Sequence, residues 1–213
     1  MNPLRLLALA TESQAAWCRQ RDVPEGTRWI FPARDQATLA APDADAWFIP
    51  DEGAAGLARL APAHIPVFVH HMTGTLDDFG QAPNIIRLNA WAGCWENGLL
   101  ELSATPAARQ LAEPLLQALG WSSEWVPDIP GFLRPRVIAM LINEACLALA
   151  DGVSTKAEID LAMKLGTNYP RGPFEWADQI GHERVHQLLQ VLAATDQRYQ
   201  PAPHMLTLLA GTI

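Results

Sequence analysis

Ionisable side chains that could perform acid–base or binding chemistry fall in three short stretches of the chain. His70 and His71 are adjacent in "IPVFVHHMTGTL", and Glu101 lies within the apolar run "GLLELSA". Arg134 and Arg136 flank a proline in "GFLRPRV". A histidine titrates near neutral pH and can act as a general base, a carboxylate can orient its ring, and arginine binds phosphate groups through paired hydrogen bonds. These residue types favour chemistry on a small molecule.

Each of these residues also has a structural explanation. Glu101 could lie on the polar face of an alternating strand, which is the explanation we favour, and the two arginines could form a solvated helix start. A cation in a first turn is unfavourable beside the helix dipole, which slightly favours an anionic partner. Neighbouring residues of a strand point to opposite faces, so His70 and His71 are not expected to grip one metal ion. Because the sequence has no His, Cys or carboxylate set at ligand spacing, we expect no metal.

The composition indicates a globular protein with a core of its own. The chain has 213 residues, of which 49% are hydrophobic and 18% charged, and its formal net charge is -8. This acidic balance disfavours nucleic acid as a partner. The three cysteines lie far apart, without CxxC spacing, which suits a reducing compartment. The apolar run "LLALA" is too short for a signal peptide or a membrane span, so we expect a cytoplasmic protein without membrane contact.

The elements that would position these residues change character near residue 127. Before it, short apolar runs alternate with helical segments, which is typical of βαβ units and a largely parallel sheet. The expected strands are 4–10, 27–32, 45–50, 65–71, 84–91, 98–104 and 122–127. The clearest helix spans 105–119 and ends at Gly120.

After residue 128 the strand patterns stop. One long apolar helix is expected over 132–151, and a second over 154–166, where Thr155 and Glu158 have the spacing of a capping box. A turn-rich segment and a helix from about 181 to 198 follow. The composition shift in "VPDIPG" marks the expected domain boundary, between residues 127 and 128.

The second half carries a specific combination of motifs: "DIPGFLRPRV", "INEACLALADGVSTKAEIDLAMKLG" and "YPRGPFEWADQIG". In order and spacing they resemble the C-terminal helical domain of the 3-hydroxyacyl-CoA dehydrogenase family. Upstream, "NIIRLNAWAG" and "LLEL" resemble the last strands of that family's Rossmann domain more weakly. The resemblance implies an α/β + all-α fold. A shortened, Rossmann-like, mostly parallel sheet domain is expected over 1–127, and a helical dimerisation domain over 128–213.

The resemblance also implies a reaction and its catalytic residues. Members of the family oxidise the 3-hydroxyl of an acyl-CoA with NAD, while a histidine takes the hydroxyl proton and a glutamate orients the imidazole. The histidine position of the motif falls on Asn89, which cannot titrate near pH 7, and the glutamate position falls on Glu101. His71 matches the first serine of a strand-end motif. The candidate catalytic residues are therefore Glu101, Asn89 and His71.

The substrate and cofactor ends depart from the family pattern as well. Where relatives offer an asparagine to the substrate, this chain has Pro135. The two arginines on either side of it, Arg134 and Arg136, could bind the phosphates of CoA. A dinucleotide site needs glycines after the first strand, but "LATESQAAW" contains none. Asp35 is a poor candidate for the acidic residue that binds the ribose. Although NAD is the family's cofactor, none is expected here.

The sequence therefore predicts a degenerate family member that lacks NAD-dependent dehydrogenation and binds an acyl-CoA-like small ligand in the inter-domain cleft. One alternative is an active oxidoreductase in which His71, or a water held by Asn89 and Glu101, is the base. Another is a dimeric structural or regulatory partner protein. A homodimer is expected because the long apolar helix must be covered, and because the helical domain forms the dimer interface in relatives. Whether any catalysis survives stays open.

Overall fold

The computed structural model describes three stretches of the chain, which are residues 3–33, 44–94 and 99–211. Contacts within it divide the chain into two compact units. The first unit holds Met1–Ala90 and Cys94–Phe132, and the second holds Trp91–Gly93 and Leu133–Ile213. The two units are described separately below.

Residues 128–132, which the sequence pattern grouped with the helical domain, lie in the first unit. Two contacts hold them there. Arg87 donates a hydrogen bond to the Asp128 carboxylate, and the backbone N–H of Gly131 donates to the carbonyl of Met72 at 2.8 Å. The composition shift therefore precedes the division between the units by five residues.

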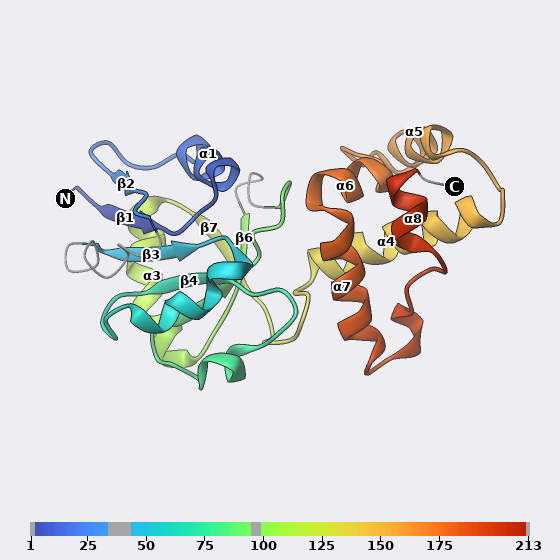
Figure 1. The fold of residues 1–213 in the computed structure, drawn as a ribbon. Coiled ribbons are helices and arrows are strands. Elements are labelled where there is room, and N and C mark those ends of the chain that lie inside the picture. The colour runs from blue at the N-terminus through green and yellow to red at the C-terminus, as the bar shows by residue number, and fades with distance from the viewer. Residues whose placement is uncertain (1–2, 34–43, 95–98, 212–213) are drawn as a thin grey trace. The chain divides into compact units, whose positions relative to one another are not determined.

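The first unit is built on a sheet whose seven described strands lie in the order β2-β1-β3-β4-β5-β6-β7 (Figure 1). The strands are β1 (Arg5–Ala8), β2 (Arg28–Ile30), β3 (Ala46–Ile49), β4 (Val67–His70), β5 (Ile85–Leu88), β6 (Leu99–Ala104) and β7 (Ser122–Trp125). Neighbouring strands run parallel except β5 and β6, which are antiparallel. The predicted mostly parallel α/β sheet is confirmed.

Both faces of this sheet are buried, because side chains alternate along each strand and apolar residues occupy both sides. Leu6 and Phe48 belong to a core that also includes residues of two α-helices, whereas Leu7 and Trp47 belong to a core with residues of two 3-10 helices. The covering elements are α1 (Glu12–Gln20), α3 (Pro106–Leu119), η3 (Glu52–Leu60) and η4 (Leu76–Phe79).

The regular elements described in the second unit are all helices, which confirms the all-α part of the prediction. Its elements are α4 (Arg134–Ala150), α5 (Lys156–Thr167), α6 (Pro173–Ile180), α7 (His182–Ala193), η5 (Gln197–Tyr199) and α8 (Met205–Ala210). Helix α4 packs against α6, α7 and α8. Its buried polar residue, Asn143, donates to the Gln200 carbonyl and accepts from the Ala202 N–H. No helix within the described ranges is long and apolar enough to span a membrane.

Helix boundaries in this unit differ from the expected ones where distant residues decide them. Helix α6 begins inside the stretch expected to be a turn, and α7 ends at Ala193 rather than near 198. The start of α6 is capped from another helix: the Asp160 carboxylate on α5 accepts hydrogen bonds from the N–H groups of Phe174 at 2.8 Å and Glu175 at 3.2 Å. A cap supplied by a residue fourteen positions away leaves no local sequence pattern.

Replacing Asp160 by alanine should lower the free energy of unfolding by about 1–2 kcal/mol, since two N–H groups at the start of α6 lose their acceptor. Urea denaturation followed by circular dichroism measures the change. Asp151→Ala, at the exposed end of α4, is the control and should stay within about 0.5 kcal/mol of the parent. Equal stability of the two variants would contradict the proposed cap.

Candidate functional site

The antiparallel pairing of β5 and β6 places Asn89 opposite Glu101. Asn89 directly follows β5, and its backbone N–H donates to the Glu101 carbonyl at 3.1 Å. Residues opposite each other in an antiparallel pair project from the same face. The Asn89 Nδ2 group accordingly donates a 2.6 Å hydrogen bond to Glu101 Oε2. The structure therefore brings together the two residues that the family motif aligns with a catalytic histidine and glutamate.

Both members of this pair are buried, with 0% of Asn89 and 2% of Glu101 exposed. The expectation that Glu101 lies on a solvated strand face was wrong, because the face of β6 that carries Glu101 points into the interior of the unit. A buried carboxylate needs hydrogen-bond donors, and the amide of Asn89 is one. An amide cannot accept a proton near neutral pH, so this pair can anchor a polar group but Asn89 cannot deprotonate a hydroxyl.

His70, the last residue of β4, belongs to the same edge of the sheet but was not among the predicted site residues. Its ring is buried, and the N–H of Ala90 donates to its Nδ1 atom at 3.1 Å. The same Nδ1 atom lies 3.2 Å from the Leu88 carbonyl, which can only accept, so the tautomer of the ring decides which of the two hydrogen bonds forms. Nε2 lies 4.0 Å from Glu52 Oε2. The adjacent histidine pair in the sequence was the signal that could have pointed to it.

His71 lies beyond the end of β4, between two carboxylates. Its Nε2 atom is 2.9 Å from Asp78 Oδ2, and its Nδ1 atom is 3.6 Å from Glu52 Oε1, which is an ion-pair distance rather than a hydrogen bond. A side chain at Gly74 would clash, since a Cβ there would lie 2.0 Å from His71 Nε2. The expected projection of His70 and His71 to opposite faces was wrong, because strand alternation stops before His71 and both rings approach Glu52.

Charge pairing fixes the protonation of this cluster. The Glu52 carboxylate, and after it Asp78, raise the pKa of His71 above its usual value, against the effect of burial. Burial would raise the pKa of Glu52, but the hydrogen bond with His71, the nearby His70 ring and the N–H groups of Met72 and Thr73 lower it to about 2. The protonated form of the His71 ring is therefore favoured, with carboxylates facing both nitrogens. Such a ring joins η3 to η4 and is poorly suited to act as a base.

This cluster predicts a definite pH dependence of stability. The raised pKa of His71 contributes stability that is fully present below the ordinary histidine value of about 6.5 and is lost as pH rises through the folded-state value. The lowered pKa of Glu52 contributes stability above its ordinary value, which is lost as pH falls toward about 2. Urea midpoints measured from pH 5.5 to 8.5 should fall with rising pH in the parent chain. His71→Gln should flatten this decline, whereas the exposed-site control His64→Gln should retain it.

Arg134, Pro135 and Arg136, the predicted substrate-binding residues, open helix α4 in the second unit. Pro135 is buried in the first turn, where its missing N–H has no helical partner to lose. Arg136 donates from Nη1 to the Tyr199 hydroxyl at 3.4 Å, and its guanidinium lies 5.3 Å from that ring. Arg134 is half-buried. Two of the three therefore have structural roles within their own unit.

The turn that follows β1 is held by hydrogen bonds between its own side chains and backbone. Thr11 caps α1 by accepting from the Gln14 N–H, and the Gln14 side chain accepts from the Thr11 N–H at 2.9 Å. The strand order reverses between β1 and β3, which is where α/β sheets of this kind bind dinucleotides. Gln14 is buried there and donates from Nε2 to the Pro50 carbonyl at 2.8 Å. The residues present do not fit a pyrophosphate.

Two further expectations about ligands concern other parts of the chain. Asp35, the poor candidate for binding a ribose, lies outside the described residues. Within the described ranges, His, Cys, Asp and Glu side chains do not gather in groups of three or more that could hold a metal ion.

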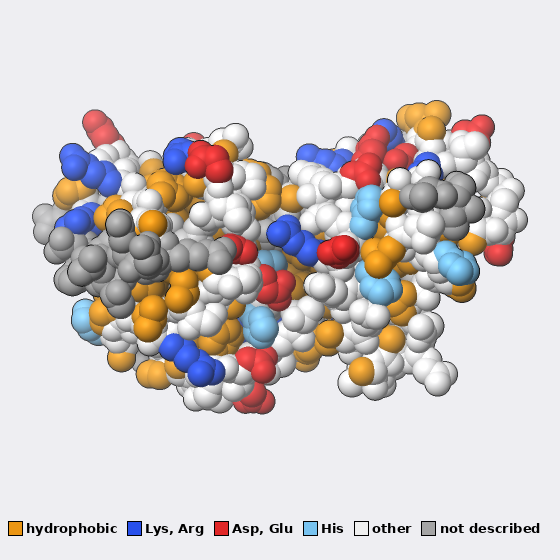
Figure 2. Space-filling view, viewed as in Figure 1, with side chains coloured by type: hydrophobic (Ala, Val, Ile, Leu, Met, Phe, Trp, Pro, Cys, Tyr) orange, Lys and Arg blue, Asp and Glu red, His pale blue; other side chains and the backbone are white. Residues whose placement is uncertain are grey.

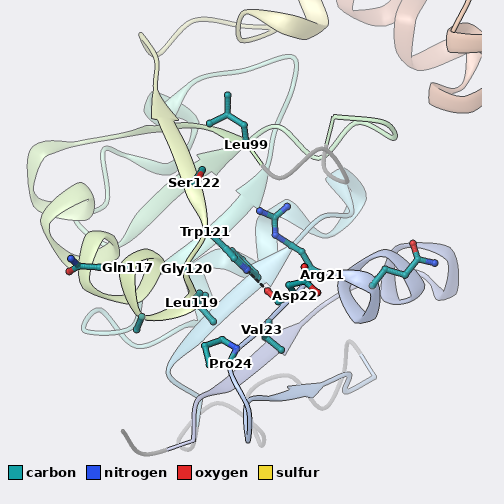
Figure 3. Close-up of a pocket in the computed structure, with 12 residues that line it drawn as sticks. Arg21, Asp22, Val23, Pro24, Leu99, Gln117, Leu119, Gly120, Trp121 and Ser122 are labelled. Atoms are coloured by element: carbon teal, nitrogen blue, oxygen red, sulfur yellow. Dashed lines mark hydrogen bonds between the residues drawn. The ribbon is translucent and has the colours of Figure 1, made fainter. Parts of the chain in front are cut away.

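A separate cavity of about 650 Å³ lies in the first unit, near the ends of α1 and α3 (Figure 3). The Arg21 guanidinium stacks over the Trp121 ring at 4.3 Å, and Trp121 Nε1 donates to the Asp22 carbonyl at 2.8 Å. The predicted catalytic and substrate-binding residues are not among those that line this cavity.

Comparisons with known proteins place these features in a family. Residues 131–211 match the model of the 3-hydroxyacyl-CoA dehydrogenase C-terminal domain. The chain is 44% identical over 88 residues to 3-hydroxyadipyl-CoA dehydrogenase of Escherichia coli, and 38% identical over 91 residues to a probable 3-hydroxybutyryl-CoA dehydrogenase of Bacillus subtilis. These matches cover 40% and 42% of this chain but only 18% and 32% of those proteins.

The fold is shared more widely than the sequence. The (S)-3-hydroxybutyryl-CoA dehydrogenase of Ralstonia eutropha superposes with a TM-score of 0.71, covering 99% of this chain and 95% of that one, at 18% identity. At this identity the likeness concerns the fold alone, and it extends to the sheet unit. Residues 131–211 therefore resemble the C-terminal domain of the 3-hydroxyacyl-CoA dehydrogenases in sequence, and the whole chain shares the fold of such an enzyme.

Proposed function

We propose that this chain is a 3-hydroxyacyl-CoA dehydrogenase-like protein that binds an acyl-CoA-like small ligand and does not carry out NAD-dependent dehydrogenation. The observation that carries the proposal is the buried hydrogen bond between Asn89 and Glu101. Hydride can leave a hydroxyl carbon only as the hydroxyl proton is taken, and an amide at the position of the base cannot take it. The carboxylate behind it then serves to hold the amide rather than an imidazolium.

The closed turn after β1 supports the same proposal. A pyrophosphate needs backbone N–H groups at a helix start that it can approach closely. Here Thr11 occupies that start as a cap, and Gln14 lies across the crevice to Pro50. His71 is poorly suited to replace the missing base, because its two ring nitrogens already face the Glu52 and Asp78 carboxylates.

Calorimetric titration and thermal shift with NAD, NADH and acetoacetyl-CoA test the proposal. We expect acetoacetyl-CoA to bind saturably and to raise the melting temperature, and NAD and NADH to do neither. Glu101→Gln should weaken acetoacetyl-CoA binding without restoring cofactor binding. Micromolar NADH binding with turnover of acetoacetyl-CoA would instead support the active oxidoreductase, and loss of that activity in His71→Gln or Glu101→Gln would identify its base. Failure of all three ligands to bind would favour the structural or regulatory protein.

We further propose that the chain forms a homodimer through the outer face of α5. Leu161 and Leu165 lie four residues apart on this helix and are 52% and 77% exposed, and Val153 in the preceding turn is 71% exposed. Figure 2 shows hydrophobic side chains gathered over this helix. Large apolar side chains that line up on one helix face are typical of a surface that another chain covers. The three cysteines are buried as thiols rather than joined in disulfides within the described residues, which is compatible with the cytoplasmic location that we infer.

Replacing Leu165 by glutamate should shift the chain from dimer to monomer, because a charge would have to be buried in the contact. Sedimentation velocity over a concentration series measures the distribution. Leu60→Glu, at a 49% exposed leucine of the first unit, is the matched control and should leave the dimer intact. A parent chain that is monomeric at high micromolar concentration would contradict the proposal.

A further inference from the structure

A groove of about 410 Å³ runs along helix α4 in the second unit. Six residues line it: Arg136, Val137, Met140, Leu141, Arg198 and Tyr199. Three of them are apolar and two are cationic.

The cationic end of the groove is built around Tyr199, which is itself buried. The guanidinium carbons of Arg136 and Arg198 lie 5.3 Å and 4.7 Å from the centre of its ring. Both arginines donate to its hydroxyl oxygen, Arg136 from Nη1 at 3.4 Å and Arg198 from Nη2 at 2.8 Å. The tyrosine thus fixes two like charges near each other.

One carboxylate of the protein offsets part of this charge. Asp196 Oδ2 lies 3.0 Å from Arg198 Nε. Within the described residues, Arg198 uses Nε and Nη2 in these contacts, and its Nη1 group has no protein acceptor. Arginine can bind a carboxylate through its terminal nitrogens in a fixed geometry. The cationic end is therefore suited to one further anion.

The apolar part of the groove begins next to the arginines. Val137, Met140 and Leu141 have the spacing of one helix face. Val137 is 50% exposed, and the other two are half-buried. The stripe offers an aliphatic chain a surface that starts within reach of the guanidinium groups.

We propose that this groove binds a single-chain anionic amphiphile, namely a medium-chain acyl carboxylate. Arg136 and Arg198 bind the carboxylate, and the alkyl chain lies along Val137, Met140 and Leu141. Each methylene placed on the apolar stripe should tighten binding by up to about fourfold, so affinity should rise from hexanoate through octanoate to decanoate.

Methyl NMR titration of the full chain with these fatty acids, below their micellar concentrations, tests the proposal. Decanoate should shift the Val137, Met140 and Leu141 methyl signals saturably, and decanol, which has the same chain without the charge, should bind at least tenfold more weakly. Arg198→Gln should weaken decanoate binding at least tenfold. The matched control is Arg171→Gln, which removes another arginine that stacks on an aromatic ring in this unit, at 5.1 Å from Trp176, and it should leave binding unchanged.

Three outcomes would overturn the proposal: the three methyl groups do not respond, decanol binds as tightly as decanoate, or Arg198→Gln binds like the parent. If a second copy of the chain covered the groove, decanoate could not reach it, and the three methyl groups would not respond. Glu101→Gln should leave decanoate binding unchanged, so failure at this groove and failure of the proposed acyl-CoA site can be told apart.

Discussion

Arg87→Met is expected to lower the free energy of unfolding by about 3–5 kcal/mol, the largest effect of any substitution considered for this chain. Arg87 is 0% exposed although it is charged. Its Nη1 atom donates to Asp128 Oδ1 at 2.5 Å, and its Nη2 atom donates to the carbonyl of His71 at 2.8 Å. Its guanidinium also stacks on Phe132 at 4.7 Å. Methionine fills much of the volume but leaves a half-buried carboxylate and a carbonyl without their donor.

Arg109→Met is the matched control for this measurement. Arg109 also pairs with a carboxylate, that of Glu113 at 2.7 Å, but both side chains are about half exposed. Exposed pairs contribute little, so this variant should lose less than about 1 kcal/mol. Urea denaturation at pH 7 compares the two variants. If they lost equal stability, Arg87 would not have the role of clamping residues 128–132 to the sheet.

Asn89→Asp should also destabilise the first unit strongly, by about 3 kcal/mol at pH 8. It would place two carboxylates at the 2.6 Å contact that Asn89 now makes with Glu101, in a site excluded from water. Like charges this close cannot both be ionised, so one carboxyl would keep its proton with a raised pKa. A raised pKa means that the folded state binds more protons, and stability is lost as pH rises through the folded-state value.

Urea denaturation at pH 5 and pH 8 measures this effect, and the deficit relative to the parent should be clearly smaller at pH 5. Asn168→Asp makes the same chemical change at the exposed end of α5 and should show little deficit at either pH. An Asn89→Asp variant with the stability of the parent at pH 8 would mean that Glu101 is not held in a buried carboxylate–amide pair.

Local sequence patterns predicted the helical unit well, because its signals lie within a few residues of one another. The spacing of Thr155 and Glu158 predicted a capping box, and both of its hydrogen bonds form at the start of α5. The apolar run over 132–151 predicted α4, which begins at Arg134. Helix α8 and the start of α6 were not predicted. The start of α6 carries local signals in Pro173 and Glu175, which accepts from the Gly172 N–H at 3.0 Å, but its cap from Asp160 on a different helix leaves none.

The candidate site was predicted in part. The resemblance to the family aligned Asn89 and Glu101, twelve residues apart, with a catalytic pair, and the antiparallel register of β5 and β6 brings them into contact. The importance of Glu52 was not predicted, because nothing in "PDEGAAG" marks it as the partner of two histidines.

The sequence by itself determined what each position can do chemically. An amide stands where the family has a base, no glycine follows the first strand, and a proline opens α4. These are covalent facts, and they hold in any fold. The alternation of short apolar runs and helical periodicity also determined the α/β and all-α architecture, because each pattern reflects the geometry of its own backbone.

Only the tertiary structure decided which polar groups are buried and which charges meet. Arg87 and Asp128 are 41 positions apart, and Gln14 and Pro50 are 36 apart. The free energy of such contacts depends on the exclusion of water, which no short stretch of sequence specifies. For that reason Glu101 could be assigned to a solvated face from its sequence, although the fold places it beside Asn89 in the interior.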